Sequence, residues 1–135
     1  MGELNVSILT PAKVVGRFQA GQVQVPSSNG YLGILPGHAK LISELGVGEL
    51  IVSTAQGRDS FFVSGGFIDV GGGDKVTLLV DVAEKASDID VERAKEAKRR
   101  ALSRLDEKLG VDVMRAQAAL LRAEQRLTVA GRRSK

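Results

Sequence analysis

The chain has 135 residues, with 19 lysines and arginines against 16 aspartates and glutamates and a formal net charge of +3. This length suits one domain, or one domain with an appendage, and is long enough to bury a hydrophobic core. The sequence contains no cysteine, which excludes a disulfide framework and a thiolate metal site.

Membrane insertion and secretion are not indicated. The beginning of the chain lacks the basic start and long apolar run of a signal peptide. Apolar runs are only a few residues long, far below the ~20 residues that span a bilayer. We therefore expect a protein that is soluble or is held at a membrane by a partner.

Residues 1–86 are predicted to form an antiparallel β-sandwich. Short apolar runs alternate with polar residues, and glycine-rich turn signals separate them. Glycine in such turns supplies a positive φ without a Cβ clash. Strands this short, with turns about 8–12 residues apart, are typical of a sandwich or barrel. The expected strands lie at residues 4–8, from 14 toward 21, and at 23–25, 31–35, 48–54, 60–64, 67–70 and 75–80, with Phe18, Phe61, Phe62 and Phe67 in or beside the core.

The loop at residues 30–38 is rich in glycine and proline and contains His38, the only histidine of the chain. A single histidine without cysteine does not make a zinc site, and no serine or aspartate stands at the spacing of a catalytic motif. We interpret His38 first as a loop residue that bonds a nearby backbone group.

Residues 87–135 are predicted to form an antiparallel hairpin of two helices. The period changes at Ile89, after which apolar or alanine residues recur every three or four positions. Ser87, Asp88 and Asp90 suit the start of the first helix. Gly110 suits its end, and Asp112 suits the cap of the second helix. The stripe on the first helix comprises Ile89, Arg93, Ala97, Ala101 and Leu105, with Ala94 and Leu102 beside it, and the stripe on the second comprises Val113, Ala116, Leu120, Ala123, Leu127 and Ala130.

The facing residues of this hairpin are largely alanine, which buries little area at ~25 cal/mol per Å². The hairpin is therefore expected to be only marginally stable by itself, while alanine keeps each helix favourable.

Charge also separates the two halves of the chain. Residues 1–86 carry 6 basic and 8 acidic residues, whereas residues 87–135 carry 13 basic and 8 acidic residues. The basic tail has no aromatic residue for base stacking, so nucleic acid is the weaker candidate partner.

Four arginines are predicted to converge in the hairpin. Arg93 and Arg100 are two turns apart on one helix, and Arg122 and Arg126 are one turn apart on the other. In an antiparallel hairpin Arg93 lies near the height of Arg126, and Arg100 near that of Arg122. Arginine forks bind phosphate oxygens bidentately, so the cluster suits a polyphosphate. Glu84 and Asp90 flank one end, where carboxylates can accept bonds from an adenine amino group or a ribose hydroxyl.

The alternative interpretation is a solvated helix face with ion pairs, for example between Glu96 and Arg100. The chain has no Walker A or dinucleotide fingerprint. A nucleotide in this cluster would therefore be sensed and not hydrolysed.

Five segments of the chain together resemble the epsilon subunit of bacterial F-type ATP synthase. They are residues 6–11, 33–38, 64–70, 74–77 and 88–94, and their order along the chain matches a β-sandwich followed by a helical hairpin. The resemblance covers essentially the whole length. It implies a non-catalytic rotor subunit on the cytoplasmic face of the bacterial plasma membrane, bound there as a peripheral part of the complex.

The resemblance also implies partners. The sandwich, residues 1–86, is expected to bind the gamma subunit and the c-ring loops, with Tyr31 and His38 assigned to that surface. The family often has an acidic residue where this chain has Tyr31. The helices, residues 87–135, are expected either to fold against the sandwich or to extend into the catalytic head. In the extended state they would inhibit ATP hydrolysis and meet an acidic segment of the catalytic beta subunit.

The resemblance further implies ATP as a regulatory ligand, alone or with Mg²⁺, that favours the folded, non-inhibitory state. The family motif is Ile or Leu, Asp, two variable residues and Arg-Ala, which matches residues 89–94. The expected ligand residues are Glu84, Ile89, Asp90, Arg93, Arg100, Arg122 and Arg126. A free-standing nucleotide-sensing domain without a rotor partner is the alternative function. Genes for beta and gamma subunits immediately upstream would distinguish the two.

Overall fold

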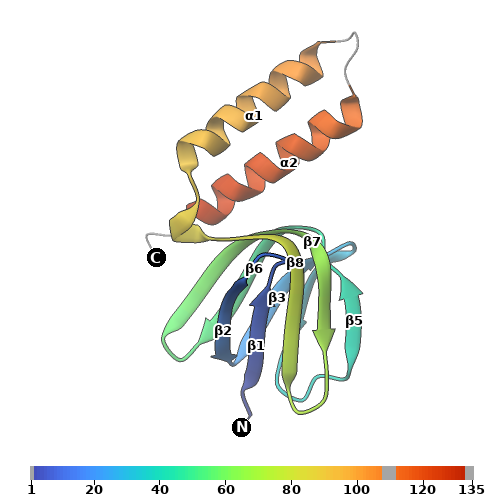
Figure 1. Cartoon of the computed structure of the whole chain (residues 1–135), viewed down its shortest axis with the longest axis vertical. Helices are drawn as coiled ribbons and strands as arrows, with labels where there is room; N and C mark the ends of the chain where they lie inside the picture. The colour runs from blue at the N-terminus through green and yellow to red at the C-terminus, as the bar shows by residue number, and fades with distance from the viewer. Residues whose placement is uncertain (1, 108–111, 133–135) are drawn as a thin grey trace.

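The computed structural model describes residues 2–107 and 112–132. Within them, eight strands are followed by a short 3₁₀ helix and two α-helices (Figure 1). The elements are β1 (Leu4–Leu9), β2 (Val14–Ala20), β3 (Gln22–Ser27), β4 (Gly30–Ile34), β5 (Leu41–Glu44), β6 (Val47–Thr54), β7 (Gly57–Val70), β8 (Lys75–Lys85), η1 (Ala86–Asp88), α1 (Val91–Asp106) and α2 (Val113–Ala130).

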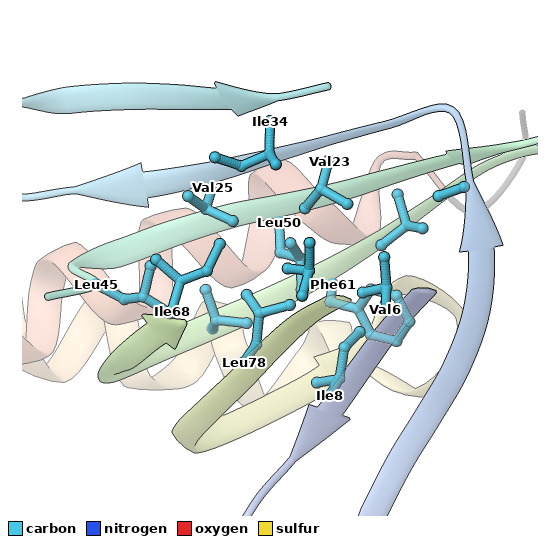
Figure 2. Close-up of a cluster of buried hydrophobic side chains, with 14 of the residues drawn as sticks. Val6, Ile8, Val23, Val25, Ile34, Leu45, Leu50, Phe61, Ile68 and Leu78 are labelled. Atoms are coloured by element: carbon cyan, nitrogen blue, oxygen red, sulfur yellow. The ribbon is translucent and has the colours of Figure 1, made fainter. Parts of the chain in front are cut away.

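The strands form one continuous hydrogen-bonded sheet in the order β2-β1-β8-β7-β6-β3-β4, with β5 paired to β7. The sheet folds over itself, so the apolar sides of its strands meet in one core. Figure 2 shows Val6, Val25, Leu50, Ile68 and Leu78 converging in that core from different strands. The predicted fold class, a sandwich followed by a helical hairpin, is therefore confirmed. All strand pairs are antiparallel except β1 and β8, which run parallel.

Strand β7 explains two differences from the sequence expectations. The runs at 60–64 and 67–70 belong to a single strand. Its first part, up to Ser64, pairs with β6, and its last part, from Phe67, pairs with β5, with Gly65 and Gly66 between the two. The buried positions change parity there, from 61 and 63 to 68 and 70. Phe67 is therefore turned outward and is 52% exposed, so its predicted place in or beside the core is wrong.

Strand β5 was not among the predicted strands, because only four residues pair and they follow a loop rich in proline and glycine. Of the other phenylalanines, Phe61 lies in the main core and Phe18 packs against it, with their ring centroids 5.9 Å apart. Phe62 is fully buried, but in a separate cluster beneath the hairpin.

Each helix is capped by a predicted residue, but α1 starts at Val91 and not at Ile89, and Ser87 and Asp88 lie in η1. The carboxylate of Asp90 accepts a hydrogen bond from the backbone N–H of Arg93, and Asp112 does the same for Arg115. Ile89 precedes α1 and is buried below it. Gly110, the predicted end of the first helix, lies outside the described residues. The alanine stripe is confirmed at Ala94, Ala101, Ala116, Ala123 and Ala130, which are buried, whereas Leu102 and Val113 are 45% and 51% exposed.

The hairpin stands on the sandwich through the C-terminal end of α2 and through η1, and α1 lies farther away (Figure 1). A small cluster closes this contact. Its buried members are Phe62, Ala86, Ile89, Val129 and Ala130. Phe62 is the fully buried side chain that the sandwich supplies, and Val47 of β6 and Val82 of β8 pack against the cluster while partly buried.

Candidate functional site

A row of three side chains on the sandwich supports the base of the hairpin. Phe62 is paired in register with Glu49 on β6 and with Glu84 on β8. Side chains at paired positions point to the same face of a sheet. Because Phe61 points into the core, Phe62 and its two acidic neighbours point to the opposite face, which α2 covers. The sheet therefore offers α2 one buried aromatic ring between two carboxylates.

Arg126 of α2 occupies one side of this row. Its Nε lies 2.7 Å from Oε1 of Glu84, and its guanidinium carbon lies 4.4 Å from the centroid of the Phe62 ring. Both charged side chains are partly buried, with exposed fractions of 29% for Arg126 and 37% for Glu84. A cation above an aromatic ring is attracted to its face. Arg126 thus connects α2 to the sandwich by charge and by stacking.

A groove of about 890 Å³ runs along the hairpin from this point toward its far end. Alanines of both helices form its floor, and five arginines line it: Arg100, Arg104, Arg115, Arg122 and Arg126. The ion pair of Lys98 with Glu124, at 3.9 Å, places these two residues at one height. With antiparallel helices, Arg100 is therefore level with Arg122, as the spacing predicts.

The helix surface around Arg100 carries some of the ion pairs that the alternative interpretation expects. Glu96 bonds Arg99 and lies 3.9 Å from Arg100. The hydrogen bond from Arg99 is the main cause that lowers the pKa of Glu96 below its ordinary value. Within residues 2–107 and 112–132, however, no ion pair engages Arg104, Arg115 or Arg122. The groove therefore has an excess of positive charge, five arginines against Glu107 and Asp112, that an anionic ligand would neutralise.

The predicted ligand residues are only partly brought together. Arg100, Arg122 and Arg126 line the groove, and Glu84 bonds Arg126 at its base. Ile89 is buried in the cluster under the hairpin, and Asp90 caps α1. Arg93 is exposed and is not among the residues that line the groove.

The sequence reasoning missed Arg104, Arg115 and Phe62. Arg115 stands seven residues before Arg122, so helical spacing contained the signal for it. Arg104 stands one turn after Arg100, so the same rule applies. Phe62 had no such signal, because the run from Phe61 to Val63 is apolar throughout and does not indicate which side faces the helices.

The two residues predicted to bind partners lie outside the groove. Tyr31 is 54% exposed, and its hydroxyl accepts a hydrogen bond of 3.3 Å from the backbone N–H of Glu49. Nδ1 of His38 lies 2.7 Å from the carbonyl oxygen of Ala39, which is the local backbone contact expected for a loop histidine. No group of acidic or histidine side chains in the described part of the chain is arranged to hold a metal ion. Among the described helices none is long and apolar enough to cross a membrane.

Two family models match the chain. One is described as the beta-sandwich domain of the ATP synthase delta/epsilon chain and matches residues 3–86. The other is described as the long alpha-helix domain of the same chain and matches residues 87–131.

Curated relatives named ATP synthase epsilon chain include one from Moorella thermoacetica, 45% identical over 133 residues, which cover 97% of this chain and 98% of the relative. Another, from Solibacter usitatus, is 44% identical over 131 residues, which cover 96% of this chain and 97% of the relative.

Solved structures show the same fold. A chain of the Euglena gracilis mitochondrial ATP synthase, in a structure of OSCP, F1 and c-ring, aligns with a TM-score of 0.81 at 20% identity, covering 93% of this chain and 79% of that one. A chain of the Tetrahymena thermophila central stalk and c-ring aligns with a TM-score of 0.54 at 15% identity, covering 98% and 96%. Because both family models and full-length relatives above 40% identity agree, the chain belongs to the ATP synthase epsilon chain family.

Proposed function

We propose that the chain is a non-catalytic subunit of the central stalk of an F-type ATP synthase, and that its hairpin is an ATP-controlled brake on ATP hydrolysis. The folded hairpin is the non-inhibitory state, and the extended hairpin is the inhibitory one. The observation that carries this proposal is the arginine groove, whose base includes Arg126 bonded to Glu84 and stacked on Phe62. A ligand in the groove would contact both helices next to the residues that hold α2 on the sandwich.

The charges of the groove support a polyphosphate ligand. Arg100 and Arg122 face each other across the two helices, and their mutual repulsion opposes close packing. Phosphate oxygens would turn this repulsion into charge-assisted hydrogen bonds, because each guanidinium has several donors. ATP shifts the hairpin only by the difference between its affinities for the two states. A groove that both helices build supplies that difference, since it is lost when the helices separate.

The outer face of the sandwich supports docking to the rotor shaft. Val14, Leu79, Phe67 and Ile42 are 47%, 53%, 52% and 73% exposed. Val14, Leu79 and Phe67 follow one another across β2, β1, β8 and β7, with half-buried Leu9 between Val14 and Leu79. Ile42 on β5 lies diagonally from Phe67, because its direct partner is Asp69 and Phe67 is paired with Glu44. A continuous exposed apolar row of this kind is typical of a protein interface. We assign this outer row to the gamma subunit, and Tyr31 and His38 to contacts with the c-ring or gamma.

In the extended state the freed arginines would meet an acidic segment of the catalytic beta subunit. The balance of 13 basic against 8 acidic residues in positions 87–135 suits that contact. Docking to gamma and the c-ring would hold the chain at the cytoplasmic face of the plasma membrane as a peripheral component.

ATP binding is tested first by calorimetry on the full chain, with and without Mg²⁺. We expect saturable binding that Arg122→Ala and Arg126→Ala each weaken about 10- to 100-fold, since each removes a charged hydrogen-bond donor. Arg93→Ala is expected to weaken binding less, because Arg93 does not line the groove. Arg99→Ala is the matched control, since among the described residues Arg99 bonds Glu96 on the same helix and does not line the groove. Unchanged affinity in both Arg122→Ala and Arg126→Ala would remove the groove as the ATP site.

Deletion of residues 88–135 tests the division of labour between sandwich and hairpin. The truncated chain is expected to bind gamma with unchanged affinity and to relieve inhibition of ATP hydrolysis in the reconstituted complex. Phe67→Asp in the full chain is expected to do the reverse and weaken gamma binding at least tenfold, because it places a charge in the outer row. Saturable ATP binding by a chain that fails to bind gamma would favour a free-standing nucleotide sensor.

A further inference from the structure

A second arginine holds the hairpin on the other side of Phe62. Arg132 follows the end of α2, where its backbone N–H bonds the carbonyl oxygen of Val129. Its Nε donates to Oε2 of Glu49 at 3.0 Å, and its Nη2 donates to Oε1 at 3.3 Å. This two-point contact joins residues that are 83 positions apart in the sequence. It is geometrically the strongest type of contact between arginine and a carboxylate.

Glu49 is an unusual residue for this contact. It is the one charged or polar residue that the described part of the chain buries, and its side chain is only 8% exposed. A carboxylate in such a place is costly unless a partner compensates it. Arg132 supplies that compensation from the hairpin, and no other ion pair of Glu49 is found among the described residues. The hydrogen bonds to Glu49 are the main cause that raises the pKa of Arg132, and an arginine is charged at every physiological pH in any case.

Tyr31 lies beside this pair. Its hydroxyl sits against the backbone of β6, where it accepts the hydrogen bond from Glu49, and a Cβ at Gly48 would come within 2.9 Å of it. Gly48 therefore makes room for the phenol next to the carboxylate.

The two arginine contacts differ in their relation to the groove. Arg126 with Glu84 lies at the base of the groove, whereas Arg132 and Glu49 are not among the residues that line it. The register Glu49–Phe62–Glu84 places the contacts on opposite sides of one ring. A nucleotide would therefore compete for or share Arg126 but would leave Arg132 in place.

We propose that Glu49 and Arg132 are positioning residues that form a nucleotide-independent latch, which holds the hairpin on the sandwich when the groove is empty. The latch sets the fraction of folded hairpin on which ATP then acts. Opening the hairpin breaks this two-point contact and exposes the carboxylate of Glu49 to water, so the latch opposes extension by the net free energy of the contact even without nucleotide. The proposal rests on the proposed function in one respect, namely that the hairpin has a folded and an extended state.

The test uses distance measurements between two spin labels in the full chain. The chain has no native cysteine, so labels attach only at introduced positions. Gln19→Cys on β2 and Gln117→Cys on α2 are both exposed, and neither takes part in the contacts described above. A docked hairpin gives one narrow distance distribution, and a released hairpin gives a broad one. The labelled parent is expected to show mainly the narrow distribution without ATP.

Arg132→Ala and Glu49→Gln are each expected to raise the ratio of released to docked hairpin about tenfold or more, the effect of losing a charge-assisted contact. The double variant is expected to exceed either single variant only slightly, because both remove the same contact. Arg132→Lys keeps the charge but loses the fork, and is expected to lie between the parent and Arg132→Ala. Arg99→Ala is the control, since it breaks an exposed contact within α1 and is expected to change nothing.

The outcomes test the Glu49–Arg132 latch separately from the proposed inhibition of ATP hydrolysis. An unchanged distribution in Arg132→Ala, or a parent without the narrow component, would overturn the latch. Arg132 follows α2 and has no role in the sandwich core, so its variants test the latch even if Glu49→Gln destabilises β6. ATP is expected to restore the narrow component in Arg132→Ala, whose groove is intact. Released hairpins that leave ATP hydrolysis uninhibited in the reconstituted complex would overturn the brake while the latch stands.

Discussion

Replacing Phe62 with alanine is expected to release the hairpin and leave the sandwich folded, whereas the same replacement at the neighbouring Phe61 is expected to destabilise the sandwich itself. Both rings are buried, with exposed fractions of 0% for Phe62 and 2% for Phe61. They point to opposite faces of β7, Phe61 into the main core and Phe62 into the cluster beneath α2. Removing a buried phenylalanine side chain costs about 3–5 kcal/mol. The two variants are expected to lose similar free energies from different structural units.

The loss at Phe62 is concentrated in the contact between hairpin and sandwich. Phe62 is the fully buried side chain that the sandwich contributes to that contact, Val47 and Val82 are only partly buried there, and the ring also supports the guanidinium of Arg126. The alanine-rich helices have little other apolar area with which to remain attached. The ion pairs at Glu49 and Glu84 would become exposed to water once the ring is gone, and exposed pairs contribute little.

Urea unfolding and hydrogen exchange distinguish the two outcomes. In Phe61→Ala the β-sheet signal is expected to unfold at a lower urea concentration, with a loss of about 3–5 kcal/mol in the free energy of unfolding. In Phe62→Ala that transition is expected to move little, while backbone amides of α1 and α2 lose their protection. If both variants lower the sheet transition equally, hairpin and sandwich unfold as one unit, and a hairpin that moves independently is wrong.

Local patterns in the sequence were sufficient for both helices and most strands, though not for β5 or the length of β7, and for part of the site. The caps at Asp90 and Asp112 follow from a single side chain that bonds a backbone N–H three residues later. The convergence of Arg100 with Arg122 follows from helical spacing and the antiparallel connection. Each of these contacts is determined within one element or between two elements joined by a short loop.

Contacts between distant strands were not accessible in this way. The parallel pairing of β1 with β8, and the pairing of Glu49 and Glu84 with Phe62, depend on register across the whole sheet. Arg132 and Glu49 have no spacing rule that connects them. Phe67 was misplaced because simple alternation from Phe61 and Val63 puts position 67 inside, and only the change of parity at the two glycines reverses it.

Because the parity changes at Gly66, we expect Gly66→Ala to lower the stability of the sandwich more than the addition of a methyl group at any other position of β7. Gly66 has φ of +113°, a conformation that residues with a Cβ rarely adopt. It is paired with Val80 of β8, and a Cβ would lie 2.7 Å from the Cα of Val80 and closer still to the carbonyl oxygen of Leu79. These neighbours are backbone atoms, so neither strand has a side chain that can move aside.

The expected cost is on the order of 4 kcal/mol or more, which is the range of severe backbone effects. Gly57→Ala is the matched control, because Gly57 has φ of +130° but no atom within 4 Å of the added Cβ. Its cost is expected to be about 1–2 kcal/mol, from the unfavourable φ alone. Urea unfolding of both variants isolates the part that arises from the close approach of β7 and β8.

The consequence extends to both proposed binding faces. Positions 62 and 67 are an odd number of residues apart, so in a regular strand one of them would point into the core. The change of parity at Gly66 instead lets β7 present Phe62 to the hairpin and Phe67 to the outer row. A variant that folds with β7 pushed away from β8 is expected to lose hairpin docking and gamma binding together, whereas Phe62→Ala loses only the first and Phe67→Asp only the second. A Gly66→Ala chain no less stable than Gly57→Ala would show that the two strands can separate at little cost, and that the parity change does not depend on glycine.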